Sequence, residues 1–202
     1  MPKQEPIKFK MRKRLTHNAH RFFRVVQDVD SYKKFIDFMP ESRVHKETKV
    51  SKTGKYGKNK HGKFDATTTI GFNAVSFDYV SKVTYSHPVV PVNFKNPKNL
   101  SWRVTSLADS SRIFDSMTSE WVIQPCKEDP LSSCIIDYRI EMAFANPLYA
   151  GITSRFFDFL VENINGQFEE RCKHVSLKGE YSDEIKYENI EEEVVIKCTE
   201  DE

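Results

Sequence analysis

The feature that most constrains the fold is a regular alternation of apolar and polar residues over the middle of the chain. It is clearest between Cys134 and Phe144, where Asp137, Arg139 and Glu141 occupy one side of a predicted strand. The other side consists of Cys134, Ile136, Tyr138, Ile140, Met142 and Phe144. A period of two residues with one apolar side is typical of a half-buried antiparallel strand. That apolar side needs a second layer of structure to cover it.

Other segments repeat this pattern, and short connections separate them. They span residues 43–50, 64–72, 75–85, 100–104 and 112–123. A further run near the N-terminus alternates Ile7, Phe9 and Met11 with basic residues. Short spacings between alternating runs favour hairpins and a meander. The sequence therefore predicts one strand near the N-terminus and six antiparallel strands between residues 43 and 144.

Two short helices are predicted between the first strand and the second. Asn18 is a favourable N-cap residue, and the apolar residues after it recur at helical spacing. The dipeptide Asp30-Ser31 is expected to cap the second short helix, which Pro40 ends.

A single long helix is predicted after the last strand, from Pro147 to about Val175. Proline suits the first position of a helix. On a helical wheel, the apolar side chains of this segment cover roughly 200°, whereas a helix on a solid core needs a stripe of about 100°. These side chains are Phe156, Phe157, Phe159, Leu160, Val161, Ile164 and Phe168. The surplus apolar surface must contact more protein, a membrane or an apolar ligand.

The order of these segments predicts an α+β fold, in which a curved antiparallel sheet wraps around the long C-terminal helix. One helix laid across a strongly curved sheet covers the apolar sides of all its strands. The arrangement leaves room for a hydrophobic cavity between the sheet and the helix.

Charge divides the chain into a basic domain and an acidic tail. Residues 179–202 hold 10 acidic residues against Lys186 and Lys197, whereas the rest of the chain has a net charge of +10. Acidic tails of this kind are typically disordered and solvated. We therefore expect a basic N-terminal extension at residues 1–6, one folded domain at residues 7–178 and an acidic tail at residues 179–202. The basic start also suits a remnant of an import presequence, although its alternation favours a strand.

The cysteines suggest neither a metal site nor a disulfide framework. Cys126, Cys134, Cys172 and Cys198 form no C-x-x-C pair, and no histidine lies at zinc-ligand spacing from such a pair. Free thiols in a reducing compartment are the simplest interpretation. The sequence also contains no run of about 18 apolar residues that would form a transmembrane helix.

Four stretches, taken together and in order, resemble a known family. They are VVQDVDSYKKFIDFMPESRV, IGFNAVSFDYVSKVTY, FDSMTSEWVIQP and IDYRIEMAFANPLY…RFFDFLVENINGQFEERC. The combination resembles the START-like, helix-grip coenzyme Q-binding protein family of mitochondria, and more widely the polyketide cyclase/dehydrase group. The resemblance covers about Val25 to Lys178.

This resemblance implies a lipid-binding protein and not an enzyme. It implies that ubiquinone, or a related polyprenyl quinone, binds in a hydrophobic tunnel without any catalytic cofactor. It further implies a chaperone or carrier that supports respiratory electron transport and coenzyme Q biosynthesis. Such a protein would sit peripherally on the matrix side of the mitochondrial inner membrane. Coenzyme Q biosynthesis or respiratory complexes are the expected partners, and no nucleic acid or metal is expected.

The tunnel is expected to draw its lining from several distant parts of the chain. The expected lining residues are Phe35, Phe38, Met39, Pro40, Phe72, Val83, Trp102, Trp121, Phe156, Leu160, Ile164 and Phe168. Gln167 and Arg171 are expected at the polar end, where a side-chain N–H can donate to a quinone carbonyl. The alternative for the apolar residues is an ordinary core, and for Arg171 it is an ion pair with a strand carboxylate such as Asp137.

Two segments are candidates for contact with a membrane. A lysine-rich loop at residues 52–63 is expected to touch anionic lipid through Lys55, Lys58 and Lys60. A solvated hairpin loop is the alternative. The stretch Phe35–Pro40 would insert into a bilayer surface if it were exposed.

Two functions of other classes stay open. A basic domain with Tyr56 among its lysines suits an RNA- or ribosome-associated protein. A cyclase-like enzyme would use Asp78, His87 or Glu120 as acid–base groups. Nothing in their spacing brings these three residues together.

Overall fold

The computed structural model describes residues 5–53, 60–72, 75–87, 100–108 and 114–175. Of residues 52–53, 60, 72, 75 and 147–160 it describes the backbone and no side chain. The elements in chain order are β1 (Ile7–Leu15), α1 (Ala19–Gln27), the short 3-10 helix η1 (Val29–Lys34), β2 (Glu41–Thr53), β3 (Lys60–Phe72), β4 (Val75–Ser86), β5 (Trp102–Ala108), β6 (Phe114–Pro125), β7 (Cys134–Phe144) and α2 (Pro147–His174). The predicted order of one strand, two short helices, six strands and one long helix is confirmed.

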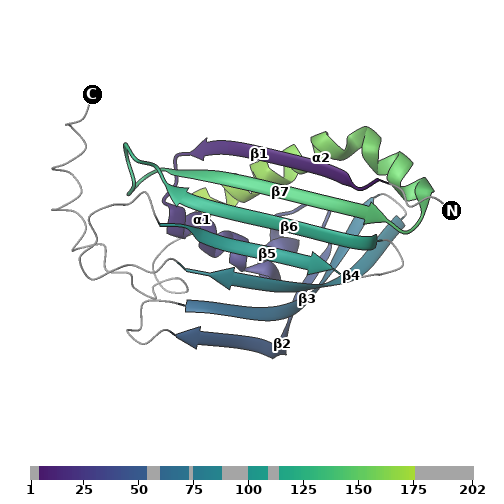
Figure 1. The fold of residues 1–202 in the computed structure, drawn as a ribbon, viewed down its shortest axis with the longest axis horizontal. Helices are drawn as coiled ribbons and strands as arrows, with labels where there is room; N and C mark the ends of the chain where they lie inside the picture. Colours follow the sequence, from purple (N-terminus) through teal and green to yellow (C-terminus); the bar gives the residue numbers. More distant parts are fainter. Residues whose placement is uncertain (1–4, 54–59, 73–74, 88–99, 109–113, 176–202) are drawn as a thin grey trace.

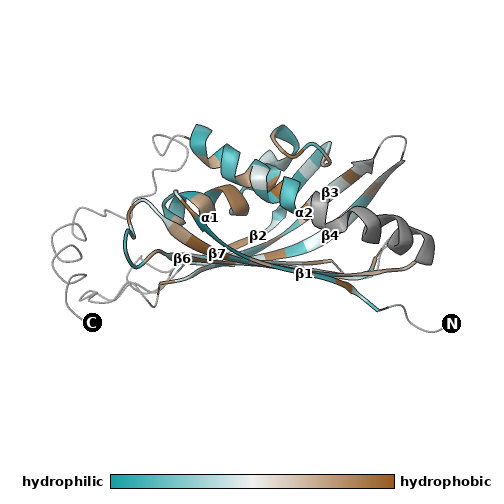
Figure 2. Cartoon of the chain, turned by 90° about the horizontal axis from the view of Figure 1, so that it is seen from above, coloured by the Kyte–Doolittle hydropathy of each residue, from teal (hydrophilic) through white to brown (hydrophobic). Residues whose placement is uncertain are grey.

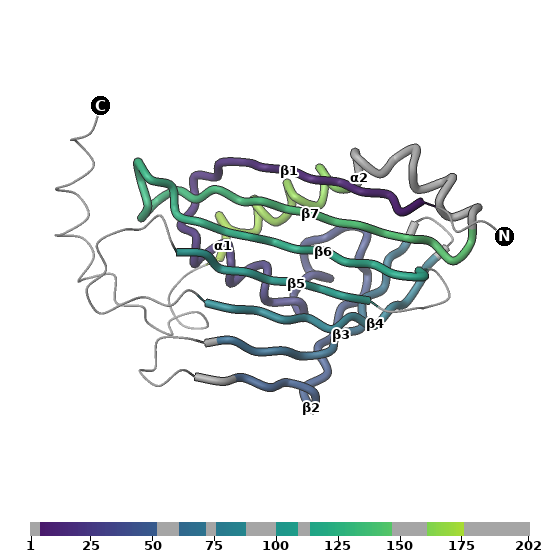
Figure 3. Tube along the Cα trace, in the orientation of Figure 1, coloured from purple at the N-terminus to yellow at the C-terminus, as the bar shows by residue number. Residues whose placement is uncertain are grey.

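The strands form one antiparallel sheet in the order β1-β7-β6-β5-β4-β3-β2. Strands β2 to β7 follow one another as a meander, and β1 then adds to the far side of β7, as Figures 1 and 3 show. Ile7 lies opposite Met142, and Leu15 lies opposite Cys134. The first strand of the chain therefore completes the sheet beside the last strand.

The helices cover one face of this sheet (Figure 2). We call that face the inner face and the opposite one the outer face. Strand β7 shows the division, because Cys134, Ile136 and Tyr138 are buried whereas Arg139 and Glu141 are exposed. The alternation predicted for this strand is thus confirmed, and it separates a packed face from a solvated one.

The N-terminal helix α1 begins as the sequence predicts. Asn18 accepts hydrogen bonds from the backbone N–H groups of His20 and Arg21 through its side-chain oxygen, at 2.9 and 3.3 Å. Its amide nitrogen donates to the carbonyl of Leu131 at 2.9 Å. One residue therefore caps α1 and ties it to the connection between β6 and β7.

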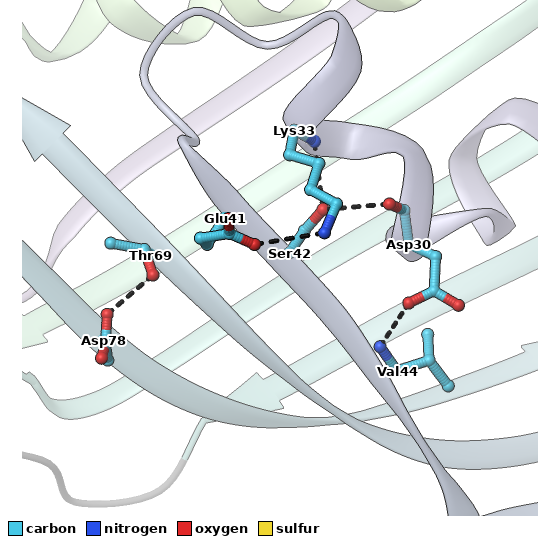
Figure 4. A network of polar contacts seen from close by, with 7 residues as sticks. All are labelled: Asp30, Lys33, Glu41, Ser42, Val44, Thr69 and Asp78. Atoms are coloured by element: carbon cyan, nitrogen blue, oxygen red, sulfur yellow. Dashed lines mark hydrogen bonds and ion pairs between the residues drawn. The ribbon is translucent and has the colours of Figure 1, made fainter.

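The second short helix differs from its prediction. It begins at Val29, so Asp30 lies inside it and makes no cap. The Asp30 carboxylate instead accepts from the backbone N–H of Val44 on β2, at 2.6 Å. Figure 4 shows this contact beside the ion pair of Lys33 with Glu41 and the bond from the Lys33 backbone to Ser42. These contacts attach η1 to the start of β2. Asp30 thus joins two elements and does not cap a helix.

The lysine-rich loop is also shorter than predicted. Strand β2 reaches Thr53 and β3 begins at Lys60, where the two residues are paired. Residues 52–53 and 60–63 are therefore parts of strands and do not belong to a loop. The alternation that predicts strands is hidden here, because lysine and glycine residues occupy both sides of the hairpin.

Candidate ligand-binding face

An aromatic cluster lies where the inner face of the sheet meets α2 and η1. The Phe168 ring of α2 is 5.3 Å from the Trp121 ring of β6 and 5.3 Å from the Phe35 ring that follows η1, measured between ring centroids. Tyr32 packs edge-on against Phe168 at 5.0 Å, and Tyr138 lies 4.1 Å from Trp121. Three residues predicted to line the tunnel thus meet from three distant segments.

Three other predicted residues lie on the same inner side without joining the cluster. Val83 and Trp102 are each 2% exposed, and Ile164 is half-buried against the core. The Trp102 ring packs near His20 of α1, at 6.3 Å between ring centroids. Its indole N–H is buried and has no acceptor within the described ranges. A buried donor of this kind is costly unless a partner satisfies it.

The segment from Phe35 to Pro40 crosses between η1 and β2 at the side of the cluster. Phe38 and Met39 are half-buried, whereas Pro40 is exposed. The Phe38 carbonyl accepts from the backbone N–H of Gly71 near the end of β3, at 3.0 Å. This bond ties the segment to the sheet, and Phe35 and Met39 pack against the hydrophobic core.

The two residues predicted for the polar end both contact that segment. The Gln167 amide donates to the Asp37 carboxylate at 2.7 Å, and its oxygen accepts from the Asp37 backbone N–H at 3.4 Å. The Arg171 guanidinium lies 5.8 Å from the centre of the Phe35 ring, a cation–π distance. The alternative ion pair of Arg171 with Asp137 is wrong, because Asp137 lies toward the outer face and pairs with Arg12 at 3.3 Å.

Buried hydroxyl groups are the part of this face that sequence reasoning missed. Burial raises the pKa of Tyr79 to about 12, although a hydrogen bond with Thr68 lowers it. Burial also raises the pKa of Tyr138 and Tyr32 above the ordinary phenol value. These phenols therefore stay protonated and can donate hydrogen bonds. Thr68 on the apolar side of its strand was the available signal.

Several predicted site residues lie outside the described part of the chain. Lys55 and Lys58 fall between the described ranges, and the side chains of Lys60, Phe72, Phe156 and Leu160 are not described. Tyr56, the aromatic residue of the RNA hypothesis, lies outside as well. Their roles stay predictions.

The three acid–base candidates lie apart on the sheet. Glu120 forms an ion pair with Arg103, and Asp78 accepts from the Thr69 hydroxyl at 2.7 Å, both on the outer face. The His87 ring instead packs edge-on against Phe23 of α1, at 4.6 Å. These positions assemble no acid–base pair from the three groups.

The described cysteine thiols lie in the interior of the protein. Cys126, Cys134 and Cys172 are free and buried, and Cys198 lies outside the description. Burial raises the pKa of both Cys134 and Cys172 to about 12. Within the described ranges, no group of three or more His, Cys, Asp or Glu side chains is placed to hold a metal ion. None of the described helices has the length and apolar character to cross a membrane.

A curved antiparallel sheet with a long C-terminal helix on its inner face defines the helix-grip class of α+β domains. The chain belongs to the polyketide cyclase/dehydrase and lipid transport family, whose sequence profile matches residues 15–169. A mitochondrial coenzyme Q-binding protein of Drosophila melanogaster is 24% identical over 160 residues, which is 79% of this chain and 56% of that protein. The chain thus spans little more than half the length of this relative.

Solved structures agree on the fold. An 18 kDa protein from Caulobacter crescentus matches with a TM-score of 0.59 and 17% identity, over 83% of this chain and 97% of that one. A STAR-related lipid transfer protein from Xanthomonas axonopodis matches with a TM-score of 0.58 and 12% identity, over 82% and 85% of the two chains. At these identities the likeness shows the fold alone, which is the START-like helix-grip fold predicted from the sequence.

Proposed function

We propose that this protein binds coenzyme Q, or a related polyprenyl quinone, between the inner face of the sheet and α2. The observation that carries the proposal is the aromatic cluster, because Trp121, Phe168 and Phe35 join the sheet, the helix and the η1–β2 segment at one place. The name of the fly relative supports the choice of ligand. In this proposal the protein is a carrier or chaperone and does no chemistry of its own.

Burial of the polyprenyl tail supplies most of the binding free energy. Each buried CH₂ group contributes about 0.8 kcal/mol, so any long isoprenoid gains from the same surface. Discrimination then depends on the quinone ring, whose carbonyl oxygens need hydrogen-bond donors. The buried phenols of Tyr79 and Tyr138 and the indole N–H of Trp102 are donors on the inner face. Gln167 and Arg171 are the donors predicted from the sequence. They contact Asp37 and Phe35 of the segment that borders the cluster.

The place of action in this proposal is the matrix side of the mitochondrial inner membrane. Lys55, Lys58 and Lys60 would contact anionic lipid there, with about 1 kcal/mol from each lysine near the surface. In this proposal, quinone passes Phe38 and Met39, which are half-buried, on its way between the bilayer and the interior. By delivering quinone to the respiratory complexes and to the complexes of coenzyme Q biosynthesis, the protein would support both processes.

The test is an organic extract of the purified, folded protein, measured by mass spectrometry after incubation with ubiquinone in detergent micelles. We expect about one ubiquinone per chain, and a clear loss of it in Phe35→Ala, which opens the rim of the cluster. Val80→Ala is the matched control, because Val80 is 51% exposed on the outer face. An extract without quinone, from a protein that is folded by circular dichroism, would sink the proposal. Salt-dependent RNA binding would then be the next measurement.

A further inference from the structure

Two rows of polar side chains cross the outer face over β3, β4 and β5. Lys63, Thr84 and Thr105 are opposite one another in register and form one row. The second row consists of His61, Ser86 and Arg103. Their chain neighbours, such as Phe64, Tyr85 and Trp102, are buried on the inner side. The rows therefore face away from the aromatic cluster and take no part in the proposed quinone site.

A pocket of about 360 Å³ opens over these two rows. Thr84 and Ser86 lie on the central strand β4, between Lys63 of β3 and Arg103 of β5. The full lining is Val50, His61, Gly62, Lys63, Thr84, Tyr85, Ser86, Arg103 and Thr105. Short residues between long ones leave a hollow there. No described helix covers this outer face of the sheet (Figure 2). This volume is at the small end of the range for small-molecule sites.

The side chains of this pocket are rich in hydrogen-bond donors. No hydrogen bond or ion pair engages the Lys63 ammonium or the His61 ring within the described ranges. Arg103 pairs with Glu120, but a guanidinium has five N–H donors and that contact uses only part of them. The three hydroxyl groups add donors at the base of the pocket. Among the described residues, none of those that line the pocket is acidic, and Glu120 pairs with Arg103 alone, so the local balance is positive.

We propose that this outer-face pocket binds a phosphate group. A phosphate monoester presents several acceptor oxygens in a small volume, which matches two cationic side chains arranged around hydroxyl groups. The same chemistry belongs to a soluble phosphate ester and to the headgroup of an anionic lipid. The pocket lies near the β2–β3 hairpin, whose last described pair is Thr53 with Lys60. The hairpin and the pocket thus share one end of the sheet.

The first arm of the test uses inorganic phosphate and the full-length protein. Phosphate replaces chloride at constant ionic strength, and NMR chemical shifts of the β3–β5 amides report binding. We expect Lys63→Gln to weaken phosphate binding by about tenfold, the size of a lost charge-assisted hydrogen bond at a half-open site. Thr84→Val should weaken it by a smaller factor of about three. Lys10→Gln is the matched control, since Lys10 is an exposed lysine of β1 outside the pocket.

The second arm identifies the source of the phosphate. Flotation is measured with phosphatidylcholine vesicles and with vesicles that also contain phosphatidic acid. If Lys63→Gln loses flotation on phosphatidic acid and Lys10→Gln keeps it, the ligand is a lipid headgroup. If both variants float equally while only Lys63→Gln loses inorganic phosphate, the ligand is a soluble phosphate compound. An absence of phosphate-dependent shifts in the unchanged protein, or equal losses in both lysine variants, would overturn the proposal.

Discussion

At the residue scale, two glycines in regular elements have opposite surroundings. A Cβ atom on Gly62 of β3 would lie 2.6 Å from the backbone carbonyl oxygen of Val50 and would also meet the Tyr85 ring. A Cβ atom on Gly166 of α2 would have no neighbour within 4 Å. The same substitution by alanine therefore acts on close packing at one site and on helix propensity at the other.

We expect Gly62→Ala to lower the free energy of unfolding by about 1–3 kcal/mol, because the backbone of β2 must move. Gly166→Ala should raise it by about 0.5–1 kcal/mol, because alanine is the better helix former. Urea unfolding followed by circular dichroism measures both values. Equal effects of the two substitutions would contradict the close approach of Tyr85 and Val50 to Gly62.

The buried thiols make a pH-dependent prediction. Burial raises the pKa of Cys134 and Cys172 to about 12 in the folded protein, above the ordinary thiol value near 9. Between these values the folded state keeps a proton that the unfolded state releases, so stability falls as pH rises. The expected slope is about 0.7 kcal/mol per pH unit for each thiol at pH 9, where the unfolded thiol is half ionised, and it approaches about 1.4 at higher pH.

Urea unfolding at several pH values between 8 and 9 measures this slope, because tyrosines of the unfolded chain, with an ordinary pKa of about 10, are still largely protonated there. Cys172→Ala should remove about half of it, and alkylation of both thiols should be slow until the protein unfolds. A stability that is constant over this range, with rapid alkylation of the native protein, would show that the thiols are open to solvent.

At the element scale, the Phe35–Pro40 segment is held from two sides. The side-chain amide of Gln167 on α2 donates to the Asp37 carboxylate and accepts from the Asp37 backbone N–H. The backbone N–H of Gly71 on β3 donates to the Phe38 carbonyl. The segment joins η1 to β2 and borders the aromatic cluster. Its release would open the cluster without unfolding the sheet.

We expect Gln167→Ala to release this segment. Overall stability should change by only about 1 kcal/mol, because one exposed hydrogen-bonded pair is lost. Hydrogen exchange of the Gly71 and Met39 amides should accelerate, while exchange of the β6 and β7 amides stays unchanged. Lys173→Ala is the control, since it removes the ion pair with Glu170 on the same helix. Equal acceleration in both variants would mean that α2 loosens as a whole.

Much of this architecture is predictable from the sequence, because the alternation of the strands is strictly local. Cys134–Phe144 and Ile7–Met11 both carry a two-residue period, and both are strands in the sheet. The role of Asp30 is not predictable in this way, because its partner is the Val44 backbone on another element. The same holds for Gln167, whose partner Asp37 lies 130 residues away along the chain. Side-chain patterns predict which face is buried, whereas polar partners depend on the tertiary fold.

At the scale of the whole molecule, every described element lies between residues 7 and 174, inside the domain proposed for residues 7–178. A chain that ends at Lys178 should therefore have the same free energy of unfolding in urea as the full chain, within about 0.5 kcal/mol. It should also float on anionic vesicles more strongly at low salt, because its net charge rises from +2 to +10. A marked loss of stability would move the domain boundary into the acidic tail. Unchanged flotation at low salt would show that the tail does not offset the basic domain.

The pairing of β1 with β7 has a consequence for synthesis of the protein. Arg12 and Asp137, which bond across these strands, are 125 positions apart. During translation β1 leaves the ribosome before the other strands, and more than a hundred further residues must follow before its partner β7 is made. Contacts of such long sequence separation form slowly. Strand β1 therefore waits for β7 to be made, and the pairing of these two strands is a natural late step of folding.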